Sequence, residues 1–124
     1  MQCTPALLMH YYLAENSFKG SKRIKKHLIV FSDMIEDCGL KGSADSYNFS
    51  AVVPANPDII INDLKKVRRM PKLEGVTVYV IGPTGGYQQS DSVSRYLAVK
   101  SFWEVFFEKA GATVKRYGAP IEYP

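Results

Sequence analysis

The chain has 124 residues, a mass of 13.9 kDa and a formal net charge of +4. This length fits one domain, residues 1–124, with enough chain to bury a core. No apolar run approaches the roughly 20 residues that span a bilayer, and no signal peptide is recognisable after Met1. The two cysteines, Cys3 and Cys38, have neither metal-ligand spacing nor a disulfide framework, which predicts a reducing, cytoplasmic location.

The basic charge is divided between two clusters, 19–27 and 65–72. Neither has the interleaved aromatic residues that a groove for single-stranded nucleic acid needs. Solvated helix faces and loops are therefore the better interpretation, and a nucleic-acid-binding accessory protein is kept as an alternative that depends on these clusters alone.

The first predicted element is a helix over residues 3–15. Thr4 suits the N-cap, Pro5 suits the first helical position, and the apolar stripe comprises Leu7, Leu8, Tyr11, Tyr12 and Ala14. A strand follows at 27–32. Its residues 28–31 are all apolar, so we expect both of its faces to be covered by helices.

Residues 34–56 predict a long loop or insertion, within which 47–53 could form a short strand. Asn56 and Pro57 then predict a helix that runs to about Met70, just before Pro71, with Ile60, Leu64 and Val67 as its buried stripe.

A strand rich in β-branched residues follows at 76–81. The last helix is predicted from Ser90 to about Ala110, where Gly111 ends it. Its apolar residues are Tyr96, Leu97, Val99, Phe102, Trp103, Phe106, Phe107 and Ala110. A final strand at 113–117 alternates in the way that is typical of a sheet edge.

The order of helix, strand, helix, strand, helix and strand predicts an α/β fold. We expect a three-layer α/β/α arrangement, a doubly wound, Rossmann-like parallel sheet with about three strands and three helices. Such sheets bind their ligands outside the carboxyl ends of the strands, where Ser32 and Asp33 fall.

The stretch Gly82-Pro-Thr-Gly-Gly86 lies between a predicted strand and a predicted helix, as phosphate-binding loops do. It has neither of the two standard glycine spacings and no lysine in the position that reaches a phosphate, so an ordinary turn is favoured. An enzyme is kept as an alternative, in which Asp33 serves a hydrolase or phosphoryl transfer and the 82–86 loop holds an anion. His10 and His27 offer it no obvious base.

Several segments together resemble the carboxyl-terminal half of a von Willebrand factor type A (VWA) domain. They are Thr4 followed by Pro-Ala-Leu-Leu, Ile29-Val-Phe-Ser-Asp33, Gly75-Val-Thr-Val-Tyr-Val-Ile-Gly82 and Phe102-Trp-Glu-Val-Phe-Phe-Glu-Lys-Ala-Gly-Ala112. The resemblance spans almost the whole chain. It implies a doubly wound sheet, a divalent metal at the strand carboxyl ends, and a non-enzymatic protein-interaction module in which Thr4 and Asp33 correspond to two metal ligands.

The family's first metal-site motif, Asp-x-Ser-x-Ser, is absent from the sequence. The metal-ion-dependent adhesion site is therefore expected to be incomplete, because Mg²⁺ wants six oxygens and Thr4 and Asp33 supply only two. Glu36 and Asp37 are candidate substitutes or interaction residues. We expect no metal in the isolated chain and Mg²⁺ or Mn²⁺ in a completed domain. The alternative is that Thr4 only caps a helix and Asp33 only forms an Asx turn.

The missing motif makes the chain either a truncated domain or a half domain that another chain completes. A strand at 27–32 without a neighbour predicts a homodimer through that edge or through the aromatic helix, with Trp103 and Phe107 as interaction candidates. The expected partner is a protein, bound through an acidic side chain of its own, rather than nucleic acid or a membrane.

Overall fold

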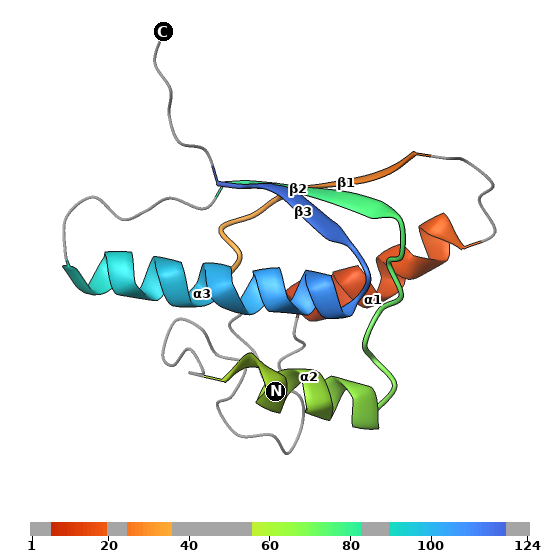
Figure 1. Cartoon of the computed structure of the whole chain (residues 1–124), viewed down its shortest axis with the longest axis horizontal. Coiled ribbons are helices and arrows are strands. Elements are labelled where there is room, and N and C mark those ends of the chain that lie inside the picture. The colour runs from red at the N-terminus through yellow and green to blue at the C-terminus, as the bar shows by residue number, and fades with distance from the viewer. Residues whose placement is uncertain (1–5, 20–24, 36–55, 83–89, 119–124) are drawn as a thin grey trace, which may run out of the picture.

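The structure, a computed structural model, describes residues 6–19, 25–35, 56–82 and 90–118. Its elements follow the order α1 (Ala6–Phe18), β1 (Lys26–Phe31), α2 (Pro57–Lys66), β2 (Val76–Ile81), α3 (Ser90–Lys109) and β3 (Thr113–Tyr117) (Figure 1). The strands form one parallel sheet in the order β1-β2-β3. The predicted parallel α/β fold and its element order are therefore confirmed. The predicted 47–53 strand lies outside the described residues.

The element boundaries follow local chemistry, with departures at the ends of α1 and α2. α1 continues to Phe18, beyond its predicted end at residue 15. The Asn56 side chain accepts a hydrogen bond from the backbone N of Asp58 (3.0 Å) at the start of α2, as an N-cap does. The helix ends at Lys66 rather than near Met70, because Arg68 adopts a left-handed backbone (φ 57°) that cannot continue it. Val67 is consequently half exposed, which corrects its prediction as a buried residue.

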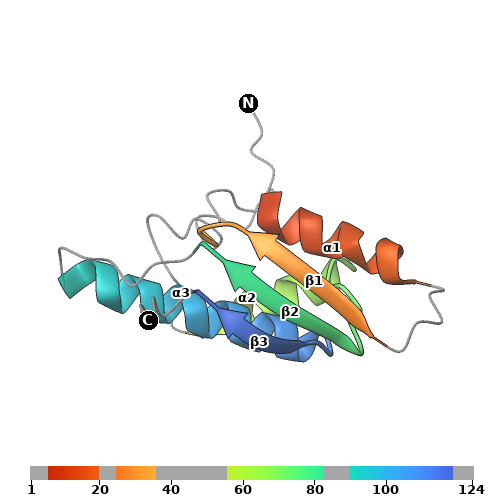
Figure 2. The same ribbon diagram turned by 90° about the horizontal axis from the view of Figure 1, so that it is seen from above.

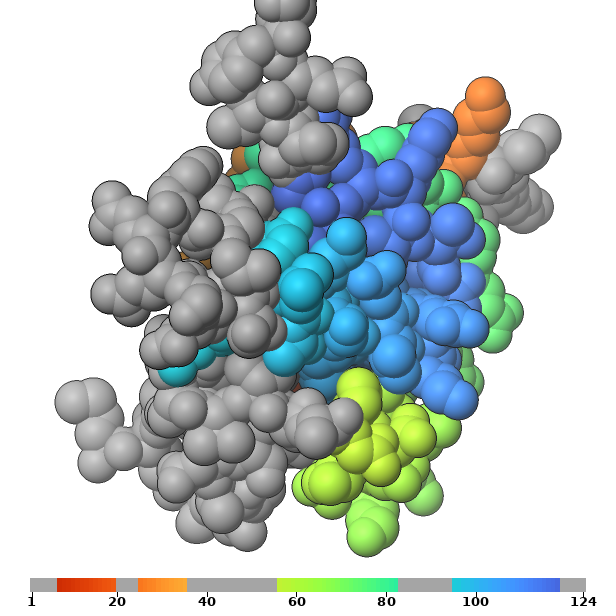
Figure 3. Space-filling view, turned by 60° about the vertical axis from the view of Figure 1, so that its left-hand side comes forward, coloured from red at the N-terminus to blue at the C-terminus, as the bar shows by residue number. Residues whose placement is uncertain are grey.

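The described helices all lie on one side of the sheet. Figure 1 shows α1 and α3 beneath the strands and α2 beneath α3, and Figure 3 shows α3 between β3 and α2. Right-handed crossovers in a sheet whose strand order never reverses place both connecting helices on the same face. The sheet formed by the described strands is therefore singly wound, with its described helices on one face.

None of the described helices covers the opposite face of the sheet (Figure 2). Ile29 is 55% exposed and Phe31 is 78% exposed on this face, so the expected cover on both faces of β1 is wrong for the described residues. The apolar run of β1 is buried on its helix side alone, where Leu28 and Val30 pack against the core.

The core is built from aromatic side chains of α3. Phe102, Trp103, Phe106 and Phe107 are all fully buried, and Tyr11 from α1 packs on Trp103 and Phe107 at ring-centroid distances of 5.3 Å and 5.1 Å. These contacts are edge-to-face, the geometry that aromatic pairs prefer. Leu97 stays half exposed, so the buried stripe of α3 is narrower than predicted.

Among the described helices, none combines the length and the apolar character that crossing a membrane requires.

Candidate functional site

The predicted ligand position after β1 is a tight turn. The Ser32 Oγ accepts a hydrogen bond from the Met34 N, and the Asp33 Oδ1 accepts one from the Ile35 N, both at 2.9 Å. Short side chains that accept from the backbone two residues on define Asx and Ser turns. Asp33 therefore has the turn role that the sequence left as its alternative.

This turn is anchored in the core by Met34, whose side chain is fully buried. The Trp103 Nε1 donates to the Met34 carbonyl O (2.8 Å), and the Tyr11 hydroxyl donates to the Met34 Sδ (3.1 Å). Gly82 supports it from β2, because a Cβ at that position would lie 2.4 Å from the Ser32 carbonyl O. The end of β1 is thus held by Tyr11 of α1, Trp103 of α3 and Gly82 just after β2.

The described residues do not provide a magnesium site. Asp33 is exposed, and no group of three or more His, Cys, Asp or Glu side chains in the described part of the chain is placed to hold a metal. Thr4, Glu36 and Asp37, the other metal or interaction candidates, lie outside the described residues. Asp33 alone does not fit a hard cation that needs a full set of oxygen ligands.

Among the described residues, neither histidine lies beside Asp33 to serve the enzyme alternative. His27 is at the other end of β1, about 20 Å away by the length of a six-residue strand. His10 is exposed on α1, and of the 82–86 loop only Gly82 is described, where it packs against the Ser32 backbone. None of these observations brings a base or an anion site to the aspartate.

The basic cluster at the end of α2 and just after it lies on the surface, as predicted. Lys65, Lys66, Arg68 and Arg69 are all exposed, and the Arg69 guanidinium lies 5.0 Å from the centre of the Tyr12 ring. A cation over an aromatic ring stabilises the contact between α1 and the end of α2.

Trp103 and Phe107 are core residues. Both are 0% exposed, and their rings pack against Phe106 at 5.2 Å and 5.3 Å. This corrects their selection as interaction candidates, because neither side chain offers surface to a partner. These two residues of α3 therefore cannot form a dimer interface.

The open face of the sheet carries the exposed apolar side chains. Ile29 is paired in register with Tyr79, and Phe31 with Ile81, which is 40% exposed. The His27 ring lies 5.8 Å from the Tyr79 ring on the same face. Parallel sheets are normally covered on both faces, so this surface is unusual for a parallel α/β fold.

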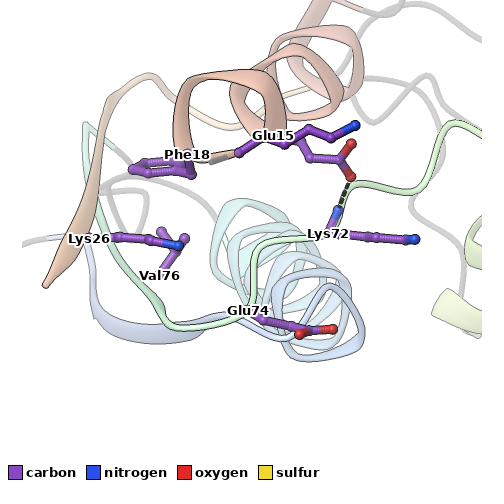
Figure 4. A pocket seen from close by; sticks show the side chains of 7 residues that line it. Glu15, Phe18, Lys26, Lys72, Glu74 and Val76 are labelled. Carbon is purple, nitrogen blue, oxygen red and sulfur yellow. Dashed lines mark hydrogen bonds between the residues drawn. The ribbon is translucent and has the colours of Figure 1, made fainter. Parts of the chain in front are cut away.

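A hollow of about 330 Å³ lies at the opposite end of the sheet, at the start of β1 and β2 (Figure 4). The Glu15 Oε1 accepts from the backbone N of Lys72 (2.6 Å) across its rim. The other lining residues are Phe18, Lys19, Lys26, Glu74 and Val76. Charges of both signs are mixed here, and the described lining contains no serine, cysteine, histidine or metal cluster.

Tyr117, at the end of β3, has a buried hydroxyl for which the described residues provide no hydrogen-bond partner. Burial raises the pKa of this phenol above its ordinary range, and the nearby Tyr96, Tyr11, Glu104 and Asp33 act in the same direction. The group therefore stays neutral where an exposed tyrosine ionises.

Sequence patterns did not single out Met34 or the face formed by Ile29, Phe31 and Ile81, and they marked Gly82 only as part of the 82–86 loop. The run at 28–31 predicted complete burial, and only the placement of every described helix on one side leaves alternate residues exposed. Comparison with known proteins adds no relative, since no family model, curated protein or solved structure matches this chain.

Proposed function

We propose that this chain is a non-enzymatic protein-interaction module that binds its partner at β1. The observation that carries the proposal is the exposure of Phe31 and Ile29 on a parallel strand at the edge of the described sheet. Contiguous exposed apolar side chains mark interaction sites, and a free strand edge is a template for strand addition.

The resemblance to a VWA domain supports the same surface. In that family the strand that ends in Ser-Asp has neighbours on both sides, whereas β1 pairs with β2 alone among the described residues. The proposal does not include the metal that the resemblance implies, because the Asp33 carboxylate accepts a hydrogen bond within its own turn. Two cysteines without a disulfide framework favour a reducing compartment, and we propose the cytoplasm.

The test compares two exposed apolar residues. Phe31→Ser on β1 and Ile59→Ser on α2 both remove exposed apolar surface, from positions that are 78% and 54% exposed. The tagged wild-type chain is used to isolate its protein partner from its native cell. Affinity for that purified partner is then measured by calorimetry for the wild type and both variants.

We expect Phe31→Ser to weaken binding by about tenfold or more, because burying a phenylalanine contributes roughly 1.5–3 kcal/mol. Ile59→Ser should bind like the wild type. Melting temperatures of the two variants, which remove no buried group, serve as the folding control. Equal affinity of all three proteins, or equal weakening in both variants, would contradict β1 as the binding surface.

A further inference from the structure

The outer edge of β1 presents backbone groups from alternate residues. The Ser32 N donates to the Ile81 O (2.9 Å), so the backbone of Ser32 faces β2. Successive strand residues direct their backbone groups to opposite sides, which turns those of Leu28 and Val30 toward β2 as well. The N–H and C=O groups of His27, Ile29 and Phe31 therefore point away from the sheet.

The two edge strands differ in how they resist pairing. Edge strands in soluble proteins are usually protected by charged residues, proline or a bulge. β3 has Lys115 and Arg116, and its register with β2 is interrupted between Val78 and Tyr79. β1 has one charged residue, Lys26 at its start, no proline and no bulge, and its register with β2 is regular. Of the two edges, β1 is the one suited to pairing.

We propose that the occupant of this edge is a second copy of the chain, paired antiparallel to β1 about a two-fold axis that passes beside Ile29. This inference rests on the proposed function and names its partner. Two identical edge strands related by a two-fold axis perpendicular to the sheet run antiparallel, and residues that face each other stay on the same side of the sheet.

The residues that face each other favour this register over its neighbours. It places Ile29 opposite the Ile29 of the second copy and His27 opposite its Phe31, so every outward backbone group finds a partner. It also brings Lys25, just before β1, toward Asp33 of the second copy, in the turn just after β1, and both residues are exposed. A shift by two residues brings Lys25 opposite Phe31 in one direction and Asp33 opposite His27 in the other, so either shift loses the Lys25–Asp33 pair.

Cysteine cross-linking tests both the partner and the register. In a chain with Cys3→Ser and Cys38→Ser, Ile29→Cys is compared with Ile59→Cys, a position of matched exposure (55% and 54%) on α2. Facing residues of an antiparallel pair have Cα atoms within the range that a disulfide bridges. We expect mild oxidation to give a dimer with Ile29→Cys and none with Ile59→Cys.

The register is tested by mixing two variants in the same background. Phe31→Cys alone should not cross-link, because the two copies of residue 31 lie about 13 Å apart along the ladder. A mixture of Phe31→Cys and His27→Cys should yield the mixed dimer. Cross-linking of Phe31→Cys with itself would overturn this register.

Charge reversal gives a readout that needs no cysteine. Light scattering should show a particle of twice 13.9 kDa for the wild-type chain. Asp33→Lys places like charges at both ends of the ladder and should weaken dimerisation by about tenfold, and adding Lys25→Asp should restore it. A wild-type chain that stays monomeric at high concentration overturns the second copy as occupant. If the wild-type chain is monomeric but Phe31→Ser weakens binding to a different protein, the proposed function stands and only the second copy is excluded. If Phe31→Ser weakens no binding, both the proposed function and this inference fail.

Discussion

Met34 combines two features that seldom occur together in one residue. Its backbone is left-handed (φ 64°), which is uncommon for a residue with a Cβ, and its side chain is fully buried. The hydrogen bond from Trp103 and the contact with Tyr11 hold it in place. The turn after β1 is therefore held both by its own Ser32 and Asp33 side chains and by the core contacts of Met34 with α1 and α3.

Gly82 supports the same turn and provides a test of it. We expect Gly82→Ala to lower the free energy of unfolding by about 3 kcal/mol or more, because its φ is 131° and the new Cβ would meet the Ser32 backbone. Gly75→Ala is the matched control. It also has a positive φ (77°) but open space around the new Cβ, so its cost should be about 1 kcal/mol. Urea unfolding measures both, and equal losses would contradict the close contact between Gly82 and Ser32.

Tyr117 gives a prediction for the pH dependence of stability. Below about pH 10 this phenol is neutral in both folded and unfolded chains and adds no pH dependence. Above it, the unfolded chain loses the proton while burial keeps the folded pKa raised, so stability falls by about 1.4 kcal/mol per pH unit. Tyr117→Phe should reduce this decline and cost little at neutral pH, because the described residues give the hydroxyl no partner. Urea unfolding of both proteins between pH 8 and 11 measures the difference, which parallel curves would contradict.

The two ends of α2 are set in different ways, one by neighbouring residues and the other by a distant contact. The Asn-Pro-Asp signal at 56–58 places the start of α2 correctly, because the cap is a contact between neighbouring residues. Its end was predicted too late, because Arg68 turns left-handed and lets Leu73 contact the core, where the Leu73 N donates to the Ala110 O (2.7 Å). The end of the helix is thus decided by a long-range contact.

The cap of α2 can be tested with a pair of asparagines. Asn56→Ala should cost about 1 kcal/mol of unfolding free energy, since it removes the acceptor for the Asp58 N. Asn62→Ala, at an exposed position inside the same helix, should be neutral or slightly stabilising because alanine is the better helix former. The measurement is urea unfolding with both variants at one pH, and a larger loss for Asn62→Ala would refute the capping role.

At the scale of the whole molecule, the sheet has helices on one face and exposed apolar side chains on the other (Figure 2). A parallel sheet with one open face has surface that a partner can cover. The exposed apolar face therefore supports the proposed binding at β1.

The same view of the whole molecule predicts the response to metal. We expect Mg²⁺ or Mn²⁺ to leave the melting temperature of the isolated chain unchanged, because a ligand stabilises a protein only if the native state binds it. Among the described residues, no acidic cluster accompanies Asp33. Thermal unfolding with and without chelator is the measurement. A metal-induced rise that Asp33→Ala abolishes would show a complete site.

The sequence by itself determined the parallel α/β class, the order of the elements and the cap of α2, because these depend on apolar periodicity and on contacts between neighbours. It left the Asx turn of Asp33 as an alternative to a metal ligand. It did not determine which face of β1 is covered, since an apolar run is the same whether a helix packs on one side or on both. Only the tertiary structure decided that Ile29 and Phe31 are exposed while Trp103 and Phe107 are buried. The physical reason is that exposure depends on how far-separated helices pack, which the winding of the strands sets.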